Sequence, residues 1–321
     1  MKEIKYLIID KKHRVKGTRE GKYATAVERI MTELANKNFP YSFAQLTQIE
    51  FLLKESETVI KVNGTDLKEY SHIIFRGHNF DNPKEYETKR LIIDWVDQYN
   101  SSNRRNRILV QNSEAIKNIP YYNKIFTAQL CSTHNIPFFD TYYRTDGRYE
   151  KHRDILENYP VIIKEYSGLN RIDKKLGRNV IKKNVYKLDS IKDLNNKYLK
   201  NQDLSNFFLQ EFTNTAEDIR VFVKLGKVIG GWRRETTKGF MTVNHGKYTM
   251  YNTPSDEIKD IAQRFAKLVD ADFIAIDFMF KNGNPYVQEI SLHPGFKAYE
   301  TKIEEGTPVN IAEAIITAFK N

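Results

Sequence analysis

Two hydrophobic patterns alternate along the first third of the chain. The apolar run at 4–9 (IKYLII) is typical of a buried strand, and the spaced apolar positions over 22–37 indicate an amphipathic helix. The same patterns predict strands at 58–62 and 72–76 around the turn Asn63-Gly64, a helix at 84–99 and a strand at 108–110. This alternation predicts an N-terminal α/β domain over residues 1–115.

The pattern changes after residue 115. We expect a helix at 121–134 that ends before Asn135-Ile136-Pro137, strands at 141–143, 161–164 and 180–181, and a helix at 189–200. These elements form a small central unit over 116–204, and its size suggests a lid. The remaining unit, 205–321, is predicted to be antiparallel α+β, with strands at 207–212, 219–225, 227–233, 274–280 and 285–291 and helices at 255–269 and 308–319.

The composition fits a soluble globular chain of several domains. Of 321 residues, 40% are hydrophobic and 29% charged, and no apolar run approaches the roughly 18 residues of a membrane-spanning helix. The single cysteine, Cys131, cannot form an intrachain disulfide, so we expect a cytoplasmic protein without a membrane partner. The net charge of +10 fits a nucleic acid, an acidic substrate or bound ATP, and does not choose among them.

Two carboxylates interrupt apolar strands near the C-terminus. Asp277 lies in FIAIDFMF and Glu289 in PYVQEISLHPGF, and the turn Asn282-Gly283 predicts that the two strands pair. A buried acid needs a cation or hydrogen bonds, and two oxygen ligands suit Mg²⁺ in a nucleotide site. The alternative is that one acid faces solvent or pairs with a basic residue such as Arg233.

Basic residues beside glycines and apolar strands form the other candidate groups. Lys164 ends the strand PVIIK and precedes a loop with glycines, which suits phosphate oxygens but also fits a solvated strand edge. Arg220 and Arg233 alternate with apolar neighbours, so we expect both in one cleft, where guanidinium groups bind phosphate or carboxylate. Salt bridging across a sheet is the alternative explanation.

Read in order, these segments resemble the ATP-grasp superfamily and, within it, the RimK-type carboxylate-amine (glutamate) ligases. The resemblance covers about 120–321. It implies an ATP-grasp fold with an N-terminal α/β (pre-ATP-grasp) domain, a small central lid and a C-terminal antiparallel-sheet domain. The segments that carry it are Asn123-Lys124, Ile136-Pro137, PVIIK, the glycine loop, LQEF, EDIRVFV, GGWRR, IAIDFMF, QEISLHPGF and NIAEAI.

The resemblance also implies roles for individual residues. Lys124 and Lys164 look like the two lysines that hold ATP phosphates. The flap over those phosphates would be the loop that contains Ser167, Gly168 and Gly177. Glu211 and Phe212 correspond to adenine contacts and Asp218 to a ribose contact; Arg220, Arg233 and Asn244 resemble residues at the phosphate and acyl-phosphate position; Asp277, Glu289 and Ser291 take the metal positions.

The chain departs from the family pattern at Ser291, where asparagine is usual. Serine is a weak magnesium ligand, so the second ion is held more loosely, or His293 or water compensates, or the chemistry is reduced. The glycine loop is also expanded by Asp173, Lys174 and Lys175. Before residue 115, Arg76-Gly77-His78 is a hypothetical substrate-binding turn.

The activity that the resemblance implies is an ATP-dependent ligation of a carboxylate to an amine through an acyl-phosphate, with two Mg²⁺ ions or Mn²⁺ in their place. The substrate would be a peptide, protein or amino acid, and the positive charge favours an acidic one. The alternatives are a non-catalytic ATP-binding switch and a basic nucleic-acid-binding protein. The sequence names neither substrate, and it leaves a homo-oligomer open.

Overall fold

The structure is a computed structural model. It describes residues 3–11, 13–14, 21–77, 83–119, 124–151, 160–165, 171–173, 178–180, 185–196, 198–235, 247–301, 303 and 306–320.

The N-terminal unit is built on a parallel sheet of four strands in the order β4-β1-β8-β9. The strands are β1 (Tyr6–Ile9), β4 (Tyr41–Ala44), β8 (His72–Phe75) and β9 (Leu109–Val110). Helices α1 (Thr25–Asn36) and α2 (Pro83–Ser102) cover opposite faces, because alternate strand residues belong to different cores. Leu7, Ile9, Ile73 and Phe75 pack on the α2 side, and Tyr6, Ile8 and Ile74 on the α1 side. The predicted α/β arrangement is confirmed.

A separate three-stranded sheet follows β4, with β5 (Ile49–Leu53), β6 (Thr58–Val62) and β7 (Thr65–Asp66) in that order. The turn Asn63-Gly64 joins β6 to β7, so the expectation that it links the strands at 58–62 and 72–76 is wrong. Both turn residues have positive φ, 50° and 77°, which is the geometry of a tight hairpin turn. The short elements of this region are β2 (His13–Arg14), β3 (Gly21–Lys22), η1 (Leu46–Gln48) and η2 (Leu67–Glu69).

The central unit forms an antiparallel sheet in the order β10-β15-β11-β14, here called the lid sheet. Its strands are β10 (Thr141–Tyr142), β15 (Phe207–Glu211), β11 (Val161–Glu165) and β14 (Val185–Leu188). A second, two-stranded sheet pairs β12 (Arg171–Asp173) with β13 (Arg178–Val180). The lid sheet has its own hydrophobic cluster, which includes Tyr149, Val161, Ile163 and Phe207.

The helix predicted at 189–200 is wrong, since this segment contains only the 3-10 helix η4 (Ile191–Asn195). Side chains here bond to the local backbone instead. The Asp193 carboxylate accepts hydrogen bonds from the backbone N–H groups of Asp189 and Ser190, and the Asn196 side chain accepts from those of Tyr198 and Leu199. Such bonds compete with the backbone bonds that would continue an α-helix.

The C-terminal unit is an antiparallel sheet of five strands in the order β18-β17-β16-β19-β20, here called the large sheet. Helix α6 (Asp256–Leu268) packs on one face through Ile258, Ile261 and Phe265.

Helix α8 is shorter than predicted: Asn310 caps its first turn, and the helix ends at Ile316. The strands are β16 (Glu217–Lys224), β17 (Lys227–Glu235), β18 (Lys247–Met250), β19 (Phe273–Lys281) and β20 (Asn284–Ser291), and the other elements are α3 (Ser113–Asn118), α4 (Lys124–Thr133), η3 (Tyr149–Lys151), η5 (Leu204–Asn206), α7 (Lys297–Thr301) and α8 (Ile311–Ile316).

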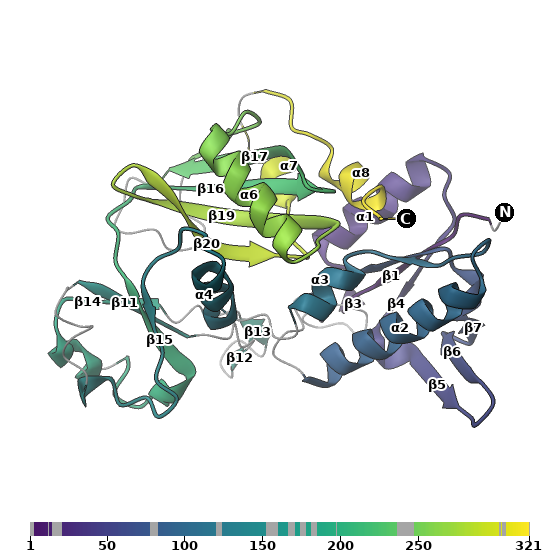
Figure 1. Cartoon of the computed structure of the whole chain (residues 1–321), viewed down its shortest axis with the longest axis horizontal. Coiled ribbons are helices and arrows are strands. Elements are labelled where there is room, and N and C mark those ends of the chain that lie inside the picture. Colours follow the sequence, from purple (N-terminus) through teal and green to yellow (C-terminus); the bar gives the residue numbers. More distant parts are fainter. Residues whose placement is uncertain are drawn as a thin grey trace.

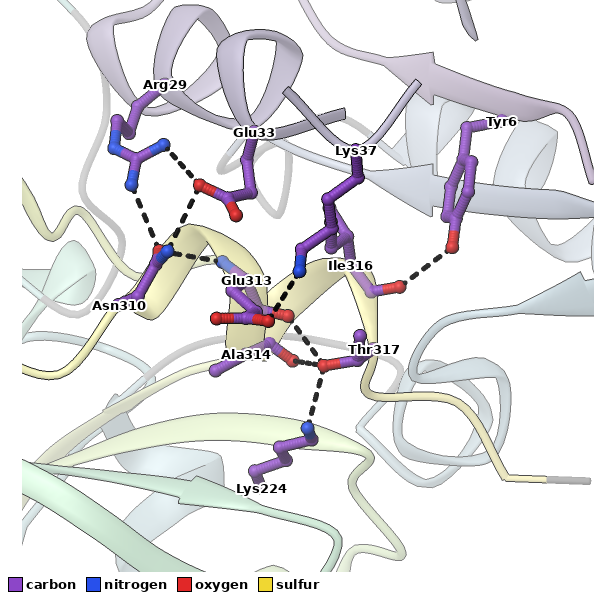
Figure 2. Close-up of polar contacts among 10 residues, drawn as sticks. All are labelled: Tyr6, Arg29, Glu33, Lys37, Lys224, Asn310, Glu313, Ala314, Ile316 and Thr317. Atoms are coloured by element: carbon purple, nitrogen blue, oxygen red, sulfur yellow. Dashed lines mark hydrogen bonds and ion pairs between the residues drawn. The ribbon is translucent and has the colours of Figure 1, made fainter. Parts of the chain in front are cut away.

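Figure 1 shows the lid sheet at one end of the molecule and the parallel sheet at the other, with the large sheet between them. Two hydrophobic clusters contain residues of both the N-terminal unit and the large sheet, whereas the lid sheet keeps a separate one. Polar contacts strengthen the first connection (Figure 2): α1 residues bond to α8, and Tyr6 Oη donates to the Ile316 carbonyl at 3.0 Å. The helix contacts are Lys37 Nζ to Glu313 Oε1 at 2.6 Å and Arg29 Nη2 to Asn310 Oδ1 at 3.0 Å. The N-terminal unit and the large sheet therefore form one packed body.

In the described part of the chain, every helix is too short or too polar to cross a membrane.

Candidate active site

The candidate site lies on the face of the large sheet opposite α6. Strand register places Arg220 of β16 beside Asp277 of β19, and Asp277 beside Glu289 of β20. Directly opposed residues of neighbouring strands point to the same face. The prediction that the two carboxylates lie on paired strands is confirmed.

Each of the two carboxylates already has a cationic partner. Arg220 donates to Asp277 through Nε at 2.6 Å and Nη2 at 2.7 Å, a bidentate pair. Lys124, at the start of α4, lies 3.4 Å from Glu289 Oε1. The structure therefore shows the alternative, in which the acids pair with basic residues. The basic partners are Arg220 and Lys124, not Arg233. Two adjacent carboxylates on the sheet are therefore flanked by Arg220 on one side and by Lys124 of α4 on the other.

A β-bulge lies next to these carboxylates. Asp277 is opposite Glu289 and the next residue, Phe278, is opposite Val287, so Gln288 is the extra residue of β20. A bulge re-aims the side chains around it. Gln288 lines the pocket described below, so the bulge supplies the site with a side chain that strict alternation would point away from it.

The metal positions fit a hard divalent cation. Asp277 and Glu289 supply carboxylate oxygens from one face, and Ser291 is two residues beyond Glu289 on the same strand. The hydroxyl oxygen of Ser291 is buried and has no hydrogen-bond partner among the described residues, so it is available to a bound metal ion or water. Within the described ranges no three acidic, histidine or cysteine side chains cluster as metal ligands. Two carboxylates, with substrate phosphates and water as further ligands, are the usual way proteins hold Mg²⁺.

An open pocket lies between the lid sheet and the large sheet. Its volume is about 390 Å³, which includes open solvent at its mouth. The predicted residues Lys164, Glu211 and Phe212 all line it. Its other lining residues are Phe139, Ile162, Val185, Gln210, Thr213, Met279 and Gln288.

The charged lining residues are held by neighbours. Lys164 is buried and donates to Gln210 Oε1 at 2.5 Å, and Gln210 in turn donates to Thr141. The Glu211 carboxylate pairs with Lys281 at 2.7 Å. Lys187 lies 5.1 Å from the centre of the Phe212 ring, a cation–π contact. The pocket thus offers one buried cation at its lid side and a neutralised acid at its rim.

Asp218 is held by Arg234, a residue that the sequence reading missed. Arg234 donates to both carboxylate oxygens of Asp218, with Nε at 2.9 Å from Oδ1. Burial raises the pKa of Asp218, and the Arg234 charge opposes that rise. Asp218 is opposite Met279, which lines the pocket, so the pair borders the expected nucleotide position.

The expectation that Arg220 and Arg233 share one cleft is wrong. Arg220 is opposite Trp232, so the next residue, Arg233, points to the other face of the sheet. There it lies 3.2 Å from Glu217 Oε2 and over the ring of Tyr251. In the sequence Arg233-Arg234, only the strand register could tell which arginine shares a face with Arg220.

Several predicted residues fall outside the described ranges. Ser167, Gly168 and Gly177 of the flap and Asn244 of the acyl-phosphate position are among them. Of the hypothetical turn Arg76-Gly77-His78, only the first two residues are described. The described residues that the structure brings together are Lys164, Glu211 and Phe212 in the pocket and Lys124, Arg220, Asp277, Glu289 and Ser291 on the large sheet.

Curated proteins with similar sequences are ligases. A coenzyme gamma-F420-2:alpha-L-glutamate ligase of Methanococcus maripaludis is 29% identical over 149 residues, which are 45% of this chain and 48% of that protein. The alpha-aminoadipate–LysW ligase LysX of Saccharolobus solfataricus is 29% identical over 193 residues, 54% of this chain and 62% of that protein. The chain therefore spans about half the length of the curated relatives it matches.

Solved structures with the same fold cover almost the whole chain. The ATP-grasp ligase PsnB, complexed with precursor peptide PsnA2 and AMPPNP, matches with a TM-score of 0.65 at 19% identity over 98% of this chain and 97% of that one. The macrocyclase MdnC bound with precursor peptide MdnA from Microcystis aeruginosa gives a TM-score of 0.66 at 14% identity over 98% of both chains. At such identities the likeness shows the fold, and the predicted ATP-grasp fold is confirmed. Because the family model for the RimK-like ATP-grasp domain also matches residues 122–319, more than half of the sequence, this chain belongs to the RimK-like ATP-grasp family.

Proposed function

We propose that the protein is an ATP- and Mg²⁺-dependent ligase that joins a carboxylate to an amine through an acyl-phosphate. One observation carries the proposal: the pocket with the buried Lys164 adjoins the row Arg220, Asp277, Glu289 and Lys124 across one face of the large sheet. A base-binding pocket, phosphate-binding cations and metal-binding acids then follow one another along a single cleft.

Asp277 and Glu289 would hold the metal, with Ser291 or water beside them. When bound, Mg²⁺ would neutralise phosphate charge and align the β- and γ-phosphates. Both acids are ion-paired in the structure described here, so metal binding would replace a cation that each acid already has. Such an exchange releases Arg220 and Lys124 to bind phosphate oxygens, and it avoids leaving any charge uncompensated.

In the reaction, an oxygen of the substrate carboxylate attacks the γ-phosphorus and the bond to the β-phosphate oxygen breaks, which releases ADP. Arg220, Lys124 and Lys164 stabilise the charge that spreads over the phosphoryl oxygens. The amine nitrogen then attacks the acyl carbon, and phosphate leaves. No side chain of the protein has to form a covalent bond with substrate.

The lid sheet would exclude water from the acyl-phosphate. It has a separate hydrophobic cluster and faces the large sheet across the pocket, so it can change its distance to the large sheet without disrupting the main core. Closure would also bring Lys164 toward the phosphates.

The substrate would be an amino acid or a peptide, with an acidic one favoured by the net charge of +10. The names of the relatives support this class, since they describe ligases of glutamate and of alpha-aminoadipate, and the PsnB and MdnC structures contain precursor peptides. Arg234 and Asp218 lie on the same face as Arg220, and we propose that they contact the substrate or the ribose. Arg233 is not part of this proposal because it points to the opposite face.

The test is release of ADP and phosphate with ATP and Mg²⁺ against a set of amino acids and acidic peptides, for wild type and Glu289→Ala. We expect release that depends on the added acid or amine and is lost in the variant. Glu257→Ala, which changes an exposed acid of α6, serves as a matched control and should leave release unchanged. Tight ATP binding without turnover against every substrate would instead indicate a nucleotide-binding switch, the function that the substitution of Ser291 for asparagine also fits.

A further inference from the structure

A second group of charges lies at the carboxyl edge of the parallel sheet. Asp10 directly follows β1 and Arg76 directly follows the neighbouring strand β8. The chain leaves β1 toward α1 on one face and β8 toward α2 on the other, so β1 and β8 flank the topological switch point of this sheet. In open α/β sheets, ligands bind in the crevice that forms at the carboxyl ends of the strands at such a point.

The group is buried and contains several cations. Arg76 is 3% exposed, Lys89 of α2 4% and Asp10 5%. Lys11 lies 2.6 Å from Glu85 at the rim, and the charges of Asp10, Lys11, Arg76 and Glu85 all act on Lys89. Three of these five described charged side chains are cations.

Arg76 has a hydrogen-bonding group to spare. Its Nη2 donates to the Pro294 carbonyl at 2.7 Å, but its Nη1 is buried and has no acceptor among the described residues. Burial lowers the pKa of Arg76 to about 10 and that of Lys89 to about 8, so both cations are held in an environment that an added anion would improve. An unused donor on a buried guanidinium is costly unless a ligand takes it.

Arg76 is joined to the candidate active site through one peptide segment. Pro294 offers its carbonyl to Arg76, and the next residue, Gly295, offers its carbonyl to Arg220 Nη1 at 3.2 Å. Arg220 is the partner of Asp277. Arg76 at the edge of the parallel sheet is therefore next to the row of Arg220, Asp277 and Glu289 on the large sheet, but it is not part of that row.

We propose that this switch-point group, Asp10, Arg76 and Lys89, is a second substrate subsite, in which Arg76 binds a carboxylate of the acidic substrate other than the one that becomes phosphorylated. The inference rests on the proposed function, because it assumes that an acidic substrate reaches the row on the large sheet. The unused Nη1 donor of Arg76 suits a carboxylate, which the planar guanidinium group binds through directed hydrogen bonds. A substrate with two carboxylates, such as glutamate or a peptide with successive acidic residues, would span the two sites.

The test measures binding, so it does not depend on turnover. Tri-glutamate with blocked termini is titrated calorimetrically into the full-length protein with Mg²⁺ and a non-hydrolysable ATP analogue, and tri-glutamine is the neutral comparison. We expect tri-glutamate alone to bind, and Arg76→Gln to weaken it about tenfold or more, the effect of losing a charged hydrogen bond. The affinity for the ATP analogue should stay the same.

Lys89→Gln is the second variant, because it removes a cation of the group and leaves the hydrogen bond between Arg76 and Pro294 in place. We expect it to weaken tri-glutamate binding at least threefold. Arg90→Gln is the matched control: it removes the next cation of α2, which is more exposed and pairs with Asp94, and should change nothing.

The outcomes separate the two proposals. Unchanged tri-glutamate affinity in both Arg76→Gln and Lys89→Gln overturns the subsite, as does a wild type that binds the ATP analogue but not tri-glutamate. Loss of ATP-analogue binding in Arg76→Gln also overturns it, since Arg76 would then act by positioning the Pro294 segment. A wild type that binds neither ligand contradicts the proposed function itself.

Discussion

The large sheet and the parallel sheet carry their charged residues in different places. In the large antiparallel sheet, Arg220, Asp277 and Glu289 stand in the middle of strands and form a row across one face, where each acid has a cation beside it. In the parallel sheet, Asp10 and Arg76 stand just past the ends of two strands, where a donor of Arg76 is left without an acceptor. One sheet presents charges from its face and the other from its edge.

The difference follows from how each sheet is covered. Helices pack on both faces of the parallel sheet, so most residues of its strands are apolar, and Asp10 and Arg76 lie just past the strand ends. The large sheet is covered by α6 on one face. On the other face Phe222 and Ala275 pack in a second hydrophobic cluster, and the row with Arg220 begins at the next position on that face. Paired charges on a face suit exchange with metal and phosphate, whereas the unused donor of Arg76 at an edge suits a fixed anion.

Asp277→Asn should have the largest effect, because it removes one metal carboxylate and leaves Arg220 without its bidentate partner. We expect the rate of ADP release to fall about a hundredfold to a thousandfold, as when a charge-stabilising group is lost from an active site. Steady-state kinetics on the folded variant check this, with Asp260→Asn on α6 as the control. A variant that keeps a tenth or more of the wild-type rate would rule out the row as the reaction site.

Arg234→Ala should mainly cost stability, since it leaves the carboxylate of Asp218 buried without its cation. We expect the free energy of unfolding to fall by about 3 kcal/mol, and the paired change Asp218→Asn with Arg234→Met to recover most of it. Urea unfolding gives both numbers. If the double variant is stable but has lost activity, the pair serves the substrate as well as the fold; a loss below about 1 kcal/mol in Arg234→Ala contradicts the burial argument.

Lys164→Met tests the lid side of the pocket. Removing the buried ammonium while keeping most of the side-chain volume should weaken ATP-analogue binding about tenfold to a hundredfold, the effect of one lost charge-assisted contact to phosphate. Calorimetric titration measures it. Lys192→Met, an exposed lysine of η4 in the same unit, is the control, and equal weakening in both variants would show a general charge effect.

Asp272→Asn should have the smallest effect, at the contact between the N-terminal unit and the large sheet. Asp272 directly precedes β19. Its carboxylate accepts a hydrogen bond, at 2.6 Å, from the backbone N–H of Asn112, which lies two residues after β9 of the parallel sheet. Burial raises its pKa to about 6, so the folded protein holds this proton to a higher pH than the unfolded chain does. Its contribution to stability is present below pH 4 and is lost as the pH rises through 6.

The asparagine variant should therefore flatten the fall of stability between pH 4 and 7. A pKa shift of this size means that the variant can gain at most roughly 3 kcal/mol in free energy of unfolding at pH 8. We expect a gain of about 1 kcal/mol, because the variant also loses the contact between Asp272 and Lys320. Thermal unfolding across this pH range measures it, with the exposed Asp260→Asn of α6 as the control. A pH profile identical to that of the wild type would show that Asp272 does not titrate near 6.

Much of the fold follows from local patterns. The alternation over 4–9, 22–37 and 84–99 predicted β1, α1 and α2, because a long apolar periodicity is specified by neighbours in sequence. The segment 189–200 was missed, since Asp193 and Asn196 bond to the nearby backbone and a helical pattern does not reveal that competition. The strands at 41–44 and 49–53 were missed because they are short and partly exposed, which weakens their pattern.

The sequence by itself determined most of the elements, the ATP-grasp order of motifs and the pairing of the two strands that carry Asp277 and Glu289, because a hairpin turn joins them. The bulge at Gln288, which puts Glu289 opposite Asp277, was visible only in the structure. Only the tertiary structure decided which cation faces which acid. Arg234 rather than Arg233 shares the face of Arg220 because pairing between strands distant in sequence sets the parity of each position. The grouping of Asp10, Arg76 and Lys89 beside Pro294 likewise arises where three elements and a distant loop meet, and no local pattern encodes such a meeting.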